Sequence, residues 1–111
     1  MLSIVVEQNG ENRILRLKGS LDAQTWISLK EEIDPLLKKM HSHLLLDLTQ
    51  VHAIVDEAVQ FLFSETEKFK KARGRLGIFG MSDHVLKAMQ RAGLDQRLLL
   101  YADEKEAMMG I

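Results

Sequence analysis

The chain begins with two short runs of β-type or alternating apolar and polar residues. They span residues 3–8 and residues 14–18. The pair Asn9-Gly10 lies between them, and Asn-Gly is a strong signal for the tight turn of a hairpin. The pattern therefore predicts two antiparallel strands at the start of the chain.

After Gly19 the apolar residues change to the spacing of an amphipathic helix. The residues on its apolar face are Trp26, Leu29, Ile33, Leu36 and Leu37. Pro35 falls inside this pattern, where it removes a backbone donor. We therefore expect the helix either to kink there or to restart with Asp34 as its cap and Pro35 at its first helical position.

The middle of the chain predicts the centre of a sheet and a second helix. Residues 43–48 (HLLLDL) form a nearly continuous apolar run, typical of a strand covered on both faces. From Asp56 the apolar residues return to helical spacing, with Glu65 as the exception on the apolar face, and this helix is expected to end near Gly74. Asp56 and Glu57 would stand at the positive end of its dipole.

The last third of the chain continues the alternation of strand and helix. Residues 76–79 predict a strand, Ser82 caps the helix after it, and Gly93 supplies the left-handed end of that helix. Residues 98–101 predict a last strand. The D-x-x-E spacing that follows fits the capping box of a short terminal helix.

The predicted order of elements is β-β-α-β-α-β-α-β-α. Strands separated by single helices require right-handed crossovers and therefore run parallel to one another. We expect an α/β fold, with a single domain over residues 1–111 and a mixed, largely parallel sheet of about five strands.

Composition narrows the class of partner. The 111 residues carry a formal net charge of −1, so no long-range field attracts nucleic acid or anionic lipid. The basic residues that cluster over 68–75 suit the wet face and end of a helix. The chain has no cysteine, its start lacks the features of a signal peptide, and no apolar run approaches the roughly 18 residues of a membrane span. We expect a cytoplasmic protein that binds neither nucleic acid nor membrane directly.

Two polar clusters could carry chemistry, and each has a simpler explanation. His41 and His43 could touch one metal ion, but no nearby carboxylate or cysteine completes a ligand set. Thr49, His52 and Asp56 have the residue types of a hydrolytic triad, yet no strained nucleophile turn accompanies them. Solvated loop residues and helix caps are the better interpretation of both.

A third cluster is acidic. Asp22, Asp47 and Asp56 fall at or near strand ends that a parallel sheet brings to one edge, where open α/β folds usually place their function. An acid and base pair is conceivable there, but no glycine-rich or aromatic pocket accompanies these residues. The glycines of residues 74–80 fit neither a dinucleotide fingerprint nor a P-loop. We therefore expect an interaction surface, not an enzyme, and no cofactor or metal.

Three stretches of the sequence resemble the STAS domain, the family of anti-sigma factor antagonists and of regulatory domains of sulfate transporters. Residues 19–23 (GSLDA) resemble its early G-x-L-D-A signature, and residues 44–51 (LLLDLTQV) resemble its central strand. Residues 74–94 resemble its next strand, the helix after it and an A-G-L ending. The resemblance covers essentially the whole chain. It implies a module that binds other proteins and has no catalytic site of its own.

The resemblance breaks where the family is regulated. In the antagonists an I-D-S-S-G-L segment leads from the central strand into a helix, and a partner kinase phosphorylates its first serine. The aligned segment here is residues 54–59 (IVDEAV), so Asp56 replaces the phosphoacceptor and Glu57 replaces the second serine. Asp56 supplies a permanent charge, smaller than the roughly −1.5 to −2 of a phosphoserine.

Three interpretations of this replacement follow. The module is locked in a phosphorylated-like state, or it binds a different partner whose basic surface needs the carboxylates, or Asp56 is a neutral replacement at a helix cap. A carboxylate lacks the size and the third oxygen of a phosphate, which favours the second interpretation. The sequence leaves open whether another Ser or Thr is phosphorylated.

The resemblance implies a role in bacterial transcription or signalling regulation. The expected partner is an anti-sigma factor or a related serine kinase-like regulator, and a homodimer is left open. The alternative is a STAS-type accessory subunit of a membrane transporter that docks on its cytoplasmic ATPase. The predicted partner-binding residues are Asp22, Thr25, His52, Asp56, Glu57 and Gln60.

Overall fold

The predicted hairpin opens the computed structural model, which describes residues 1–10, 12–39 and 41–110. Strands β1 (Leu2–Asn9) and β2 (Asn12–Leu21) pair antiparallel, with Leu2 opposite Gly19. Gly10 lies in the turn with a φ of 66°, in the left-handed region that glycine adopts without strain. Glu11, which lies between the two predicted strands in the sequence, is outside the described residues.

The remaining strands extend the sheet in parallel. Strand β3 (His43–Ile54) lies between β2 and β4 (Arg75–Phe79), and β5 (Leu99–Tyr101) follows β4 at the edge. The strand order β1-β2-β3-β4-β5 is the order of the sequence. The predicted α/β fold with a mixed, largely parallel sheet is therefore confirmed.

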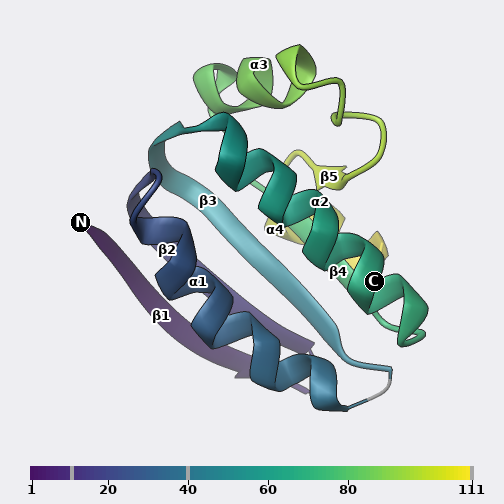
Figure 1. Cartoon of the computed structure of the whole chain (residues 1–111). Helices are drawn as coiled ribbons and strands as arrows, with labels where there is room; N and C mark the ends of the chain where they lie inside the picture. The colour runs from purple at the N-terminus through teal and green to yellow at the C-terminus, as the bar shows by residue number, and fades with distance from the viewer. Residues whose placement is uncertain (11, 40, 111) are drawn as a thin grey trace.

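Helices cover both faces of this sheet. Figure 1 shows α1 and α2 side by side on one face, α4 on the opposite face and α3 beyond one end of β3. Their bounds are α1 Thr25–Ile33, α2 Asp56–Lys71, α3 Asp83–Arg91 and α4 Glu104–Gly110. No helix in the part of the chain that the structure describes is long and apolar enough to cross a membrane.

Pro35 ends the first helix as expected. α1 stops at Ile33, and a 3₁₀ helix, η1 (Asp34–Lys38), begins with Pro35 in its first turn. Asp34 does not cap this restart with its side chain, because its Oδ2 accepts a hydrogen bond from Lys30 Nζ at 2.5 Å. The restart is confirmed, whereas the capping role of Asp34 is wrong.

The other helix ends follow local rules. Ser82 Oγ accepts a hydrogen bond from Val85 N at 3.2 Å at the start of α3, and Gly93 ends that helix with a φ of 73°. Asp103 Oδ1 accepts from Glu106 N at 2.9 Å before α4. The N-cap residue of α2 is Val55, and Asp56 is the first helical residue. The expectation that Asp56 caps α2 is therefore wrong.

Two apolar clusters fill the space on the two sides of the sheet. The larger lies under α1, α2 and α3 and includes Leu44, Leu46 and Leu48 of β3. The smaller contains Leu45 of β3 and Ala107 of α4, together with one residue each from β2 and β4. Because successive strand residues point to opposite faces, β3 contributes to both clusters, which explains its continuous apolar run.

Strand β3 is longer than the apolar run predicts, because its pairing with β2 continues to Ile54 and slips twice on the way. Arg16 pairs with Asp47 but Lys18 pairs with Gln50, and the shift recurs one step later. Each slip places one extra residue on β3, as in a β-bulge. Residues 49–52 therefore belong to the strand, and the loop predicted there is wrong.

Candidate partner-binding site

The ends of β2 and β3 bring two helix starts together. Leu21 pairs with Ile54 at the end of the parallel ladder, and Val55 N donates to Leu21 O at 2.9 Å. Asp22 and Asp56 follow immediately. The segments 22–25 and 56–60, which are far apart in the sequence, therefore meet at one edge of the sheet.

Asp22 and Thr25 form a reciprocal hydrogen-bonded turn before α1. Asp22 Oδ1 accepts from the backbone N–H groups of Thr25 and Gln24, both at 2.9 Å. Thr25 Oγ1 accepts from Asp22 N at 2.9 Å and donates to Ser20 O at 2.6 Å. These bonds, that from Thr25 N first and that from Gln24 N next, lower the pKa of Asp22. The turn therefore holds a charged carboxylate at the start of α1.

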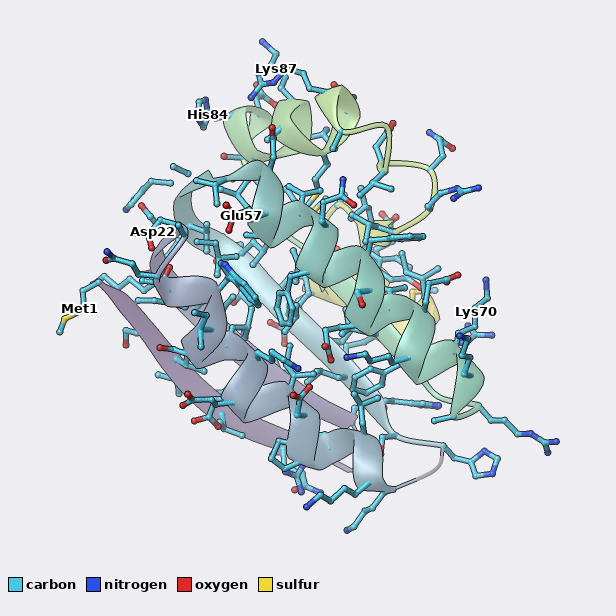
Figure 2. All side chains as sticks on the ribbon, in the orientation of Figure 1. Met1, Asp22, Glu57, Lys70, His84 and Lys87 are labelled. Atoms are coloured by element: carbon cyan, nitrogen blue, oxygen red, sulfur yellow. The ribbon has the colours of Figure 1, made fainter. Side chains whose placement is uncertain are left out.

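The first turns of α2 present polar side chains to solvent. Asp56, Glu57 and Gln60 are all exposed, and the two acids stand at the positive end of the helix dipole. None of the ion pairs recorded between described residues involves either acid. Figure 2 shows Glu57 and Asp22 at the same end of the molecule as Met1. Both acids of α2 are thus available to a cation from another molecule.

His52 lies in β3 and not in the predicted loop. Val51 pairs with Gly19 and Ala53 pairs with Ser20, so His52 is the extra residue of the second bulge. Its side chain is exposed. A bulge re-aims side chains at the end of a strand. A β-bulge therefore positions His52, whereas the other predicted site residues lie at helix starts.

Two exposed apolar side chains accompany these polar residues. Val55 is 38% exposed and directly precedes Asp56, and Ile27 on α1 is 47% exposed. Ile27 lies off the apolar stripe of its helix, so its exposure could have been predicted from the sequence pattern. Val55 carried no such signal, since an apolar residue before a helix is normally buried against it.

Asp47 does not join this edge. It lies on the face that α4 covers, five ladder steps before the end of β2, which at roughly 3.3 Å per residue is about 17 Å away. Its Oδ2 accepts from Arg16 Nη1 at 2.8 Å, and its Oδ1 accepts from Thr49 N at 2.9 Å and Thr49 Oγ1 at 2.7 Å. The acidic cluster considered from the sequence is therefore split.

Arg16 joins three acids from distant parts of the chain. Besides Asp47 it binds Glu104 through Nη1 at 2.9 Å, and its Nε pairs with Glu7. Burial raises the pKa of Asp47, but the hydrogen bonds from Thr49 and Arg16 outweigh it, so the pKa is lowered. The hydrogen bond to Glu104, followed by that to Asp47, raises the pKa of Arg16. Asp47 is therefore a charged structural residue, unsuited to proton transfer at neutral pH.

The other clusters singled out from the sequence assemble no site for chemistry. Thr49 is engaged by Asp47 in the middle of β3, seven residues before Asp56. Among residues 1–10, 12–39 and 41–110 no group of three or more His, Cys, Asp or Glu side chains could hold a metal ion. The edge formed by residues 22–25 and 55–60 is therefore the candidate site, and we call it the acidic edge.

Comparison with known proteins identifies the family. The sequence model of the STAS domain matches residues 3–107, which is nearly the whole chain. The chain belongs to the STAS domain family. Comparison of this STAS domain with the sequences of curated proteins finds no match.

Solved structures of anti-sigma factor antagonists share the fold of this STAS domain. An antagonist from Mycobacterium paratuberculosis superposes with a TM-score of 0.88 at 21% identity, covering 100% of this chain and 94% of that one. A putative antagonist from Thermotoga maritima gives 0.88 at 17% identity, with 97% and 93% covered. SpoIIAA in its unphosphorylated form gives 0.79 at 20% identity, with 98% of both chains covered. At these identities the likeness shows a shared fold.

Proposed function

We propose that this STAS domain is a non-catalytic binding module whose partner is an anti-sigma factor or a related serine kinase-like regulator. The contact surface is the acidic edge, with Asp22, Asp56 and Glu57 as its charges. The observation that carries the proposal is the meeting of two helix starts at the ends of β2 and β3, which gathers half-buried Asp22 and the two exposed acids of α2 beside exposed Val55. Thr25, His52 and Gln60 complete the surface.

The charge of the acidic edge specifies the kind of partner. Asp56 and Glu57 lie in the first turn of α2, where the helix dipole stabilises them without any cation from this chain. A basic patch on the partner would neutralise both and exclude water from them. Exposed Val55 and Ile27 supply apolar area beside the charges. The partner surface is therefore basic with an apolar component.

The position of Asp56 accounts for regulation in this proposal. The proteins with the same fold include SpoIIAA, whose structure exists in unphosphorylated and phosphorylated forms. Asp56 aligns with the phosphoacceptor serine of the antagonists and carries no hydroxyl. In our proposal its carboxylate is a permanent contact to the basic partner, so the complex forms without a serine phosphorylation switch.

Affinity purification of the tagged protein from its native cells tests the identity of the partner. A sigma-regulating or kinase-like protein in the purified complex supports the proposal. Recovery of only a transporter ATPase with its membrane subunits would replace it with the accessory-subunit alternative. Asp56→Ser tests the alignment in the same experiment, because incorporation of phosphate at residue 56 by a co-purified kinase is expected only if that residue occupies the phosphoacceptor position.

A charge-matched pair of variants tests the surface. Asp56→Asn with Glu57→Gln is expected to weaken the complex by about tenfold or more. The reason is that the basic groups of the partner would be desolvated at the interface without the opposite charges that these acids supply. Glu32→Gln with Glu106→Gln removes the same charge from exposed sites outside the acidic edge and should leave the affinity unchanged. Equal affinities for both double variants, measured by titration calorimetry, would reject this surface.

A further inference from the structure

A cavity of about 560 Å³ opens at the edge of the sheet opposite the acidic edge. It lies where β2 and β3 begin, below η1 and beside α2. Its volume is within the range of small-molecule sites, roughly 300–1,000 Å³. The residues that line it are Gln8, Arg13, Pro35, Leu36, Lys39, His41, Ser42, His43, Leu44 and Phe69.

The lining combines an apolar wall with a cationic rim. Exposed Pro35 and half-buried Leu36 supply apolar surface. Arg13 and Lys39 supply positive charge. Two histidines and the amide and hydroxyl of Gln8 and Ser42 add polar groups. No carboxylate is present among the described residues that line the cavity. The cavity therefore favours an anion that carries an apolar body.

Local secondary structure gives no reason for a cation at Arg13. Arg13 alternates along β2 with Leu15 and Leu17, which are buried in the larger apolar cluster, so its side chain is directed toward the helix layer. It is half-buried, and none of the hydrogen bonds or ion pairs recorded between described residues engages its guanidinium. A bound anion would give this half-buried guanidinium a charge-assisted partner.

The field around the cavity is positive. Lys70, Lys71, Arg73 and Arg75 lie at the end of α2 and the start of β4, and β4 begins beside His43. Figure 2 shows Lys70 at the end of the molecule away from Asp22 and Glu57. The lysines complement the helix dipole, but Arg13 lies near the start of β2 and has no dipole to complement. Together they concentrate anions at the cavity mouth.

The wall formed by residues 41–42 is held in place before any ligand arrives. Ser42 Oγ lies 3.0 Å from both Leu36 O and Lys39 O, which share its single proton. His41 N donates to Ala72 O at 3.0 Å. Gly74 permits this packing, because a Cβ there would lie 2.1 Å from Ser42 O. A preformed wall reduces the entropy lost on binding.

We propose that this cavity binds a small organic phosphate, a monoester whose apolar group packs against Pro35 and Leu36 and whose phosphate is held by Arg13 and Lys39. Guanidinium and ammonium groups donate charge-assisted hydrogen bonds to phosphate oxygens, Arg in a bidentate manner. The site is separate from the acidic edge, so a ligand can occupy it while a protein partner is bound.

The probe for this site is 1-naphthyl phosphate, titrated by calorimetry and by NMR. Binding with a submillimolar Kd is expected, together with amide shifts at residues 13, 36, 39 and 69 and weaker binding at raised salt. Titrations of 1-naphthol and of inorganic phosphate should each give about tenfold weaker binding, since each lacks one of the two recognised groups. If 1-naphthoate binds as tightly as the ester, the phosphate assignment is overturned in favour of a carboxylate.

Matched variants assign the binding to this cavity. Arg13→Gln with Lys39→Gln should weaken binding of the probe by about tenfold or more. Lys87→Gln with Arg91→Gln removes the same charge from exposed sites on α3 and should leave the affinity unchanged. The single variants and their melting temperatures separate loss of binding from loss of folding. Absence of binding at millimolar probe, shifts that map elsewhere, or equal losses in both double variants would overturn the proposal.

Discussion

The two faces of the sheet are covered by different means. Among the described residues, twenty-two buried apolar residues form one continuous cluster on the face of α1 and α2, whereas four form the cluster under α4. On the α4 face Arg16 adds ion pairs to Glu7, Asp47 and Glu104. Apolar burial therefore holds the helices against the first face, and ion pairs contribute much of the packing on the second.

The two faces also shift the pKa of a buried carboxylate in opposite directions. Asp47, on the α4 face, is 7% exposed and has Arg16 and Thr49 as partners, so its pKa is lowered despite burial. Glu65, on α2, is 1% exposed, and burial raises its pKa more than Lys68, at 3.2 Å, lowers it. The same chemical group is thus stabilised in its charged form on one face and in its neutral form on the other.

The largest expected effect comes from truncation of the apolar face. Leu62 on α2 is fully buried, so Leu62→Ala should lower the free energy of unfolding by about 3–4 kcal/mol through lost transfer and a cavity. Leu99→Ala makes the same change where the side chain is 38% exposed and should cost less than about 1 kcal/mol. Urea denaturation measures both, and similar costs would contradict the assignment of the main core to the face of α1 and α2.

A smaller effect is expected from removal of the cation on the α4 face. Arg16→Met leaves Asp47 largely buried without its ion pair and should lower the free energy of unfolding by about 2 kcal/mol. Arg16→Lys keeps the charge and should recover part of this loss in the same denaturation experiment. If the two variants are equally stable, charge pairing does not help to cover this face.

Asp47→Asn should cost less, about 1 kcal/mol, because the amide oxygen can still accept from Thr49. The lowered pKa of Asp47 in the folded protein makes this loss dependent on pH. The stabilisation by the carboxylate is present above the pKa of the unfolded chain and is lost as pH falls through the lowered folded value. Unfolding curves of the variant and the parent should therefore converge on strong acidification, and a constant difference would exclude this explanation.

The smallest expected effect is a gain in stability, from a substitution of Glu65. Glu65 has a raised pKa, so the stability of the folded protein is greatest below the pKa of the unfolded chain and is lost as pH rises through the folded value. Glu65→Gln should remove this dependence and raise the free energy of unfolding at neutral pH by about 0.5–1 kcal/mol. Glu32→Gln, at an exposed site, is the control and should change nothing. A less stable Glu65→Gln would show that Lys68 compensates the buried charge fully.

Much of the fold could be predicted because its signals are local. The caps at Ser82 and Gly93 and the helix restart at Pro35 depend on backbone geometry within a few residues. The acidic edge was also predictable in part, since parallel strands end together and Asp22 and Asp56 follow two of them. The length of β3 was not, because residues 49–54 join the strand through their pairing with β2.

Local sequence patterns establish which segments are strands and helices, their order, and the family to which the chain belongs, because periodicity, turn residues and short motifs act over a few positions. The roles of individual charges follow from tertiary packing. Arg16 meets Asp47 and Glu104, which are 31 and 88 positions away, and Arg13 of β2 lines one cavity with Leu36 of η1. Burial and partners set a charge's pKa and its cost, and both depend on which distant segments pack together.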